Sequence, residues 1–221
     1  MNSMSSTGIN SSVQPFDRTF LLTLERAWNA PHSRSQKTVD HLNAMKISAE
    51  PFFGFDGGVT GLRTEHTYEI DNPGTNYRIG PKTVSLYLGH LAMWRMCEHL
   101  EGDSFLILED DVRFKPDWEE HFEFALPALP NDWDLLYLGS CCCMGHGNNP
   151  VQVSGHLHKV DYALCTHAYA VRKKALPILR WECEKIYAGV DIAMCLHGIP
   201  RLNAYAFLPR LADQFETEIA P

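Results

Sequence analysis

The chain has 221 residues, of which 27 are acidic and 19 basic, so its formal net charge is −8. An acidic balance of this size disfavours nucleic acid and anionic lipid surfaces as partners. Hydrophobic residues make up 45 % and charged residues 21 % of a sequence without internal repeats. The composition therefore predicts one globular domain.

The seven cysteines, three of them adjacent at 141–143, lack the spaced framework of a small secreted fold. We expect reduced thiols and a cytoplasmic protein, free or peripheral to a membrane. No run approaches the ~18 apolar residues of a membrane span, so no transmembrane segment is expected.

The serine-rich start predicts a disordered leader over residues 1–15, followed by a single domain over 16–221. Phe16–Leu24 predicts a first strand, and the polar stretch Glu25–Ser35 a loop at its carboxyl end. Arg26 and Arg34 then lie where a phosphate could be bound, or are solvated loop charges.

A helix from Ser35 and a strand at Pro51–Phe55, closed by Asp56, complete the outline of a nucleotide-binding half without a glycine-rich fingerprint. Residues 58–80 show no periodicity and predict a surface loop or lid. Pro81 opens a helix in which His90 adjoins an apolar stripe. A packed histidine and a catalytic one are both compatible with that position.

The sharpest concentration of charge is Phe105–Val112, where four apolar residues precede Glu109, Asp110 and Asp111. The apolar run predicts a buried parallel strand with acids at its carboxyl end, where open α/β sheets bind ligands. In extended backbone Glu109 and Asp111 share a face, and such a carboxylate pair suits Mg²⁺ or Mn²⁺. A solvated acidic loop is the alternative.

Beyond this run, Asp134–Gly139 predicts a buried strand, and residues 140–150 a loop at the same end of the sheet. Cys165–Val171 predicts a further strand, and Asn203–Leu208 the last one. Asp191 begins a short helix after Gly189. A carboxylate there complements the helix dipole, or it acts in catalysis.

Several short motifs follow one another in a characteristic order. They are Leu22-Thr23-Leu24-Glu25-Arg26, Phe55-Asp56-Gly57, Leu88–Trp94 around His90, Leu106–Val112, Trp133–Gly139, Thr166–Val171, Val190-Asp191, and Pro209 with Gln214. In this order they resemble glycosyltransferase family 25, which includes bacterial lipooligosaccharide and collagen hydroxylysine galactosyltransferases. The resemblance extends from Arg18 to Gln214.

The resemblance implies a GT-A-type α/β fold with a mixed, mostly parallel central sheet flanked by helices. It implies a UDP-sugar donor, with galactose favoured, and Mn²⁺ or Mg²⁺ at Glu109 and Asp111. The acceptor would be a hydroxyl on a glycan, glycolipid or protein, as in lipopolysaccharide biosynthesis. The nucleotide-contacting residues would be Thr23, Arg26, Asp56, Glu109 and Asp110.

An inverting transferase needs a base opposite the leaving diphosphate, since the acceptor hydroxyl loses its proton as it attacks. Asp191 is the first candidate for that base, and His90 and Asp213 are the next candidates. One alternative is a sugar nucleotidyltransferase, which usually opens with a glycine-rich basic loop. Another is a catalytically silent domain that binds nucleotide-sugar.

Overall fold

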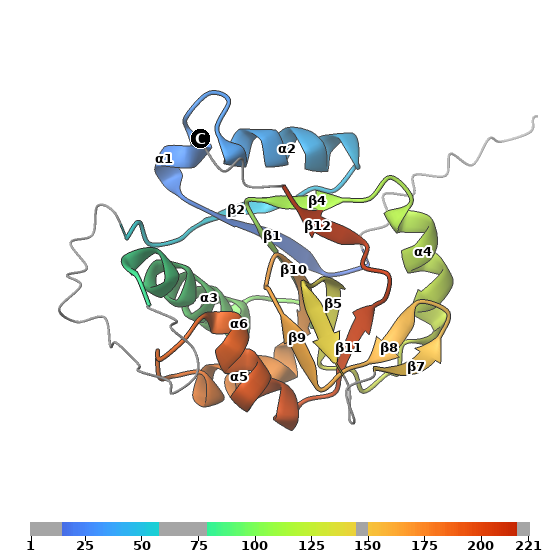
Figure 1. Ribbon diagram of the computed structural model, residues 1–221. Helices are drawn as coiled ribbons and strands as arrows, with labels where there is room; N and C mark the ends of the chain where they lie inside the picture. Colours follow the sequence, from blue (N-terminus) through green and yellow to red (C-terminus); the bar gives the residue numbers. More distant parts are fainter. Residues whose placement is uncertain (1–14, 58–78, 145–149, 216–221) are drawn as a thin grey trace, which may run out of the picture.

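The computed structural model describes residues 15–57, 79–144 and 150–215. The predicted leader at 1–15 and the predicted loop or lid at 58–80 therefore lie almost wholly outside the described residues. Within them, eight strands form one sheet in the order β2-β1-β3-β10-β5-β11-β8-β7 (Figure 1). Their bounds are β1 Arg18–Thr23, β2 Glu50–Phe53, β3 Ser104–Glu109, β5 Leu135–Gly139, β7 Val151–Ser154, β8 Leu157–Lys159, β10 Ala168–Arg172 and β11 Ala204–Phe207.

The strand directions decide which loops meet. β2, β1 and β3 are parallel to one another, as are β5 and β11, whereas β10 runs antiparallel between β3 and β5. β8 and β7 extend the sheet by antiparallel pairing. The carboxyl ends of β1, β3 and β5 therefore share an edge with the amino end of β10. The predicted α/β class, with a mixed central sheet flanked by helices, is confirmed.

Helices cover both faces of the sheet. Figure 1 shows α2 on one side, and α3, α5 and α6 together on the other. The α-helices are α1 Glu25–Trp28, α2 Arg34–Ala44, α3 Pro81–His99, α4 Trp118–Ala125, α5 Leu176–Glu182 and α6 Val190–Ala193. Three short 3₁₀ helices, η2 Leu126–Ala128, η4 Lys173–Ala175 and η6 Ile199–Arg201, and one π-helix, η5 Met194–Gly198, complete the set in the described residues.

Alternation along β1 shows how the sequence divides the core. Phe20 and Leu22 pack in the cluster on the α3 side, while Leu21 packs in the cluster that contains Leu42 of α2. Successive strand side chains point to opposite faces, so one strand contributes to both clusters. The sheet is consequently buried on both sides, as the apolar strands predict.

Two small ribbons lie beside the central sheet. β4 Val112–Phe114 pairs with β12 Ala212–Gln214, and β6 Cys142–Met144 pairs with β9 Tyr162–Leu164. Gly139 ends β5 where a Cβ atom would lie 2.3 Å from His167 Nε2 and 2.6 Å from the Ala212 carbonyl oxygen. Only glycine allows β12 and the start of β10 to approach β5 this closely.

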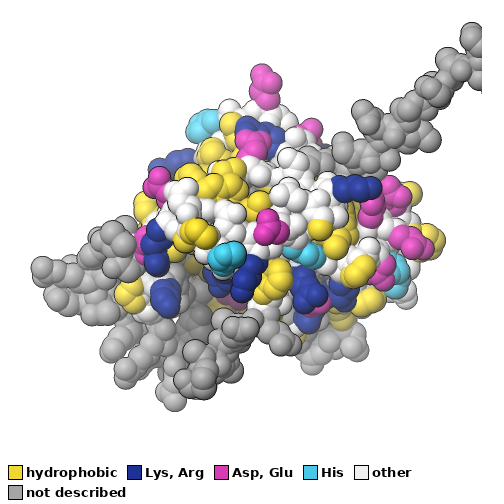
Figure 2. All heavy atoms as spheres, turned by 90° about the horizontal axis from the view of Figure 1, so that it is seen from above, with side chains coloured by type: hydrophobic (Ala, Val, Ile, Leu, Met, Phe, Trp, Pro, Cys, Tyr) yellow, Lys and Arg dark blue, Asp and Glu magenta, His cyan; other side chains and the backbone are white. Residues whose placement is uncertain are grey.

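The upper face of the molecule carries acidic and basic side chains interspersed with apolar ones (Figure 2). On the described part of this face there is thus no long single-sign stripe of the kind that follows a nucleic-acid backbone. None of the helices in the described ranges combines the length and apolar character that crossing a bilayer requires.

Candidate active site

The acidic run lies at the shared edge of the sheet, but its backbone differs from the prediction. The strand ends at Glu109, and Asp110 and Asp111 form a turn before β4 begins at Val112. The expectation that one extended strand aligns Glu109 with Asp111 is therefore wrong. The turn, held by pairing of β4 with β12, is what places the Asp111 carboxylate.

Glu109 is fixed by two neighbours. Its Oε1 accepts a hydrogen bond from the Thr166 hydroxyl and lies 3.1 Å from His90 Nε2. Burial on its own would raise the pKa of Glu109, yet the hydrogen bonds from His90 and Thr166 bring the pKa below its usual value of 4.5. Glu109 is therefore a charged carboxylate at neutral pH.

Asp111 is poorly neutralised by its surroundings. Its Oδ2 accepts a hydrogen bond from Gln214 at 3.2 Å and lies 3.7 Å from an Arg34 nitrogen. Its Oδ1 is buried without a hydrogen-bond partner in the described part of the chain. Burial, together with the charge of Glu109, raises the pKa of Asp111 to about 6.

Glu109 and Asp111 together have the properties of a site for a divalent cation. A buried carboxylate oxygen without a donor is costly, and an adjacent second carboxylate increases that cost. A hard cation bound between the two acids would satisfy the orphaned Oδ1 and offset the repulsion. The donor set of Glu109 and Asp111 thus fits Mn²⁺ or Mg²⁺.

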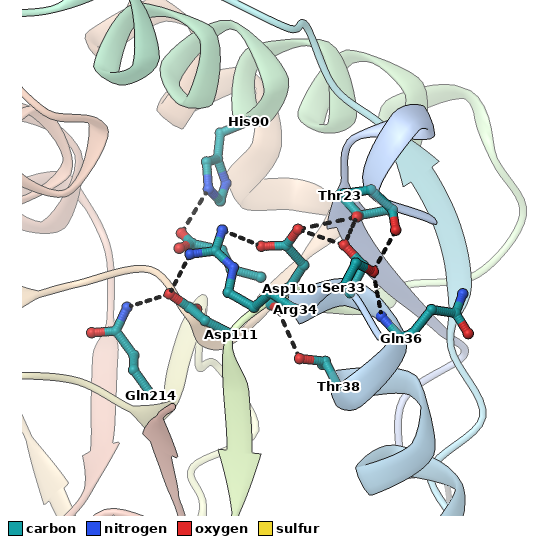
Figure 3. Close-up of polar contacts among 12 residues, drawn as sticks. Thr23, Ser33, Arg34, Gln36, Thr38, His90, Asp110, Asp111 and Gln214 are labelled. Carbon is teal, nitrogen blue, oxygen red and sulfur yellow. Dashed lines mark hydrogen bonds and ion pairs between the residues drawn. The ribbon is translucent and has the colours of Figure 1, made fainter. Parts of the chain in front are cut away.

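Asp110 faces the other way and is saturated with donors (Figure 3). Its side chain accepts hydrogen bonds from Thr23 at 3.1 Å, from Ser35 at 2.8 Å and from Arg34. Its carbonyl oxygen accepts another from Thr38 at 2.7 Å. These bonds tie the acidic turn to the start of α2. The nucleotide-contacting role of Thr23 and Asp110 stays a prediction, and their burial favours a supporting role.

Two further predicted nucleotide contacts are brought together. Arg26 of α1 and Asp56, which follows β2, form an ion pair. The Arg26 side chain is 68 % exposed, so it can exchange this partner for a ligand at small cost. Their contact with a nucleotide stays a prediction.

A pocket of about 290 Å³ joins the sheet edge to α6. Glu109, Thr166, Asp191 and Gln214 all line it, and Lys82 brings a basic side chain to the same lining. Asp191 is oriented there by backbone N–H groups, since Oδ2 accepts from Cys165 at 3.1 Å and Oδ1 from Ile192 at 2.9 Å. The helix-start and catalytic interpretations of Asp191 are therefore compatible.

His90 occupies a different environment from that expected of a base. Its side chain is 0 % exposed and lies behind Glu109, with Nδ1 3.0 Å from the Tyr169 hydroxyl. A ring without exposed surface has no path to an acceptor hydroxyl. Its geometry supports a positioning role through Glu109 instead of direct proton transfer.

A larger hollow of about 880 Å³ lies between α3 and α5. It is lined largely by apolar side chains, among them Leu88, Leu91 and the exposed Trp181. The acids of the sheet edge do not line it. Size alone therefore does not identify the site, since the acids Glu109 and Asp191 line the smaller pocket.

The expectation that all cysteines are reduced thiols is wrong. Cys141 and Cys165 form a disulfide, because antiparallel pairing of β6 with β9 brings together residues 24 apart in sequence. His167 lies close enough for a three-ligand metal site, but the disulfide occupies both sulfur atoms. The bridge adjoins the site, since Cys141 Sγ lies 3.6 Å from Gln214 Oε1.

The sequence did not predict three residues that contact the acids of the site. Thr166 binds Glu109, Gln214 binds Asp111, and Arg34 binds both Asp110 and Asp111 instead of facing a phosphate alone. Thr166 and Gln214 both belong to the motifs that resemble glycosyltransferase family 25. This resemblance is the one sequence signal for them, because their partners are fixed only by the sheet topology.

Comparison with curated proteins finds relatives of one kind. The chain is 24 % identical over 169 residues to "Probable inactive glycosyltransferase 25 family member 3" of Bos taurus, and 26 % identical over 165 residues to "Glycosyltransferase 25 family member" of Drosophila melanogaster. It is 24 % identical over 166 residues to "Procollagen galactosyltransferase 2" of Mus musculus. These matches cover 70–72 % of the chain. The resemblance to glycosyltransferase family 25 is confirmed.

The chain spans only 26–28 % of the length of these relatives. No family model matches it. Among solved structures, A197 from STIV aligns at a TM-score of 0.47 and 14 % identity, over 91 % of this chain and 87 % of that one. HddC from Yersinia pseudotuberculosis aligns at 0.42 and 12 % identity, over 87 % and 89 %. Likenesses of this degree do not bear on function.

Proposed function

We propose that the chain is a metal-dependent glycosyltransferase of the GT-A type. It would transfer a hexose from a UDP-sugar to a hydroxyl of a glycan, glycolipid or protein, with inversion at the sugar carbon. Galactose is the favoured sugar, because two relatives are named procollagen galactosyltransferase 2. Lipooligosaccharide is one candidate acceptor.

The observation that carries the proposal is the pairing of Glu109 with an incompletely satisfied Asp111 at the ligand-binding edge of the sheet. Transfer from a nucleotide-sugar releases a diphosphate, and a divalent cation at these acids would stabilise its growing charge. Lys82, in the lining of the same pocket, adds a positive charge toward that diphosphate.

Asp191 is the proposed base. It lines the pocket with Glu109 but comes from α6, across from β3. Its two backbone hydrogen bonds hold the carboxylate in place without neutralising it. A carboxylate held in this way can take the proton of the attacking acceptor hydroxyl.

A catalytically silent nucleotide-sugar-binding domain is the second candidate. It is favoured by a specific observation, since the names of some relatives describe them as inactive. Such a domain would keep the Mn²⁺-dependent nucleotide site and lack turnover.

The deciding experiment measures UDP binding and UDP release with a panel of UDP-hexoses, with and without Mn²⁺. We expect Mn²⁺-dependent UDP binding and release, with Asp111→Asn abolishing release and weakening binding. Asp40→Asn, on the exposed side of α2, is the matched control and should behave as the unmodified chain. Binding without release for every donor would favour the silent domain, whereas full activity of Asp111→Asn would refute the metal site.

A further inference from the structure

Three buried side chains form a hydrogen-bonded series behind Glu109. Trp94 Nε1 lies 2.8 Å from the Tyr169 hydroxyl, which lies 3.0 Å from His90 Nδ1. His90 Nε2 in turn lies 3.1 Å from Glu109 Oε1. Trp94, Tyr169 and His90 each have 0 % exposure, so water does not compete for these contacts.

Counting donors and acceptors gives the direction of each bond. The indole N–H of Trp94 only donates, so the Tyr169 oxygen accepts it. The single hydroxyl hydrogen of Tyr169 then needs an acceptor, and His90 Nδ1 is the one within reach in the described structure. An Nδ1 that accepts places the imidazole hydrogen on Nε2, where it donates to the Glu109 carboxylate.

The consequence falls on Glu109. Both the His90 and the Thr166 hydrogen bonds end on Oε1, so the carboxyl group cannot rotate freely. Oε2 of Glu109 receives neither bond and is therefore the oxygen available to bind a cation. A group that hydrogen-bonds a metal ligand and fixes its orientation, as His90 would do for Glu109, commonly contributes about 10–100-fold to metal affinity.

We propose that Tyr169, supported by Trp94, is a positioning residue of the metal site: it fixes the tautomer of His90, which orients Glu109. This inference rests on the proposed function, because it assigns a purpose to Glu109 as a cation ligand. The alternative is that these contacts serve only to satisfy polar atoms within the core.

The chain contains a matched control for that alternative. Tyr137 is 1 % exposed and packs with its ring centroid 6.0 Å from that of Tyr169. Its hydroxyl has no hydrogen-bond partner in the described part of the chain. Tyr169→Phe and Tyr137→Phe therefore each remove one buried hydroxyl from the same core, and only the first interrupts the series.

The test measures Mn²⁺ affinity by the electron paramagnetic resonance signal of free Mn²⁺, with folding checked by circular dichroism. We expect Tyr169→Phe, which acts on Glu109 only through His90, to raise the dissociation constant several-fold, up to about 10-fold, and Tyr137→Phe to leave it unchanged. Nitrogen-15 spectra at neutral pH should show His90 protonated on Nε2 in the unmodified chain. Tyr169→Phe should lose that fixed tautomer.

Unchanged Mn²⁺ affinity in Tyr169→Phe, or an equal loss in both variants, would overturn the proposal. So would a His90 protonated on Nδ1 in the unmodified chain. If the unmodified chain binds no Mn²⁺ while His90 shows the expected tautomer, the proposed function has failed and the series serves packing alone. The two failures are thus distinguishable.

Discussion

The charged form of Asp111 destabilises the folded chain, because its burial is not fully compensated by hydrogen bonds. Its folded-state pKa of about 6 lies above the usual 3.8, because burial and Glu109 disfavour the charged form. Below about pH 4 both the folded and the unfolded chain hold the proton. Between about pH 4 and pH 6 the unfolded chain releases the proton while the folded chain retains it, so the free energy of unfolding falls. Above about pH 6 the full loss, roughly 3 kcal/mol at most, is present.

Asp111→Asn should therefore show a pH-dependent gain in stability. Without metal, its free energy of unfolding relative to the unmodified chain should rise from about pH 4 to above pH 6, by an amount up to the roughly 3 kcal/mol given above. Urea denaturation at several pH values in a chelator measures this. Added Mn²⁺ should reverse the difference at pH 7.5 by stabilising only the unmodified chain. A difference independent of pH would contradict the raised pKa.

Asp191 gives a prediction about turnover. If it takes the acceptor proton, Asp191→Asn should lower turnover by roughly two to four orders of magnitude, the usual range for general base catalysis. Asparagine retains only one acceptor oxygen for the two N–H groups of Cys165 and Ile192, so a stability loss of about 1 kcal/mol is also expected.

Measurement at matched folded fraction separates these effects. UDP and Mn²⁺ binding should barely change in Asp191→Asn, because the acids of the sheet edge are intact. A fully active Asp191→Asn would move the role of base away from α6. Asp213 of β12 is then the remaining candidate, although it already pairs with Arg210.

The local sequence pattern predicted which segments form strands but not how these strands pair. The apolar run before Glu109 predicted β3 because burial on both faces leaves a continuous hydrophobic signature. The antiparallel direction of β10 leaves no such signature. Yet that direction brings Thr166 to Glu109, so this contact could not be predicted from spacing.

The same reason explains the missed disulfide. Cys141 and Cys165 look unrelated in sequence until β6 pairs with β9. The two bridged cysteines, which adjoin β6 and β9, then contact different residues of the site. The Cys165 N–H donates to Asp191, while Cys141 contacts Gln214 beside Asp111. The bridge thus holds the proposed base and the proposed metal site in one unit.

Replacing both bridged cysteines by serine should destabilise the chain. For the loop that these cysteines close, chain entropy predicts a loss of about 3 kcal/mol in the free energy of unfolding. Urea denaturation under non-reducing conditions measures it, and Cys142→Ser, at an exposed free thiol, is the control. Thiol titration in denaturant should find five thiols among the seven cysteines. Seven would contradict the bridge.

The two hydrophobic clusters, one on each face of the central sheet, share strands of that sheet. Leu21 lies in the cluster of the α2 side, whereas Met93 of α3 lies in the cluster on the opposite face. Because β1, β3, β5 and β10 contribute to both clusters, neither face can lose its packing without disturbing the other. We therefore expect the two faces to unfold together, as the single domain predicted from length and composition would.

Leu21→Ala and Met93→Ala should consequently shift the same unfolding transition. Each side chain is almost fully buried, so each substitution should cost about 2–5 kcal/mol. Leu196→Ala, at an exposed position of η5, should stay within about 0.5 kcal/mol. Far-ultraviolet circular dichroism and tryptophan fluorescence should report coincident curves for every variant. If one substitution displaced only the fluorescence curve, the two faces would unfold separately and the single-domain prediction would be wrong.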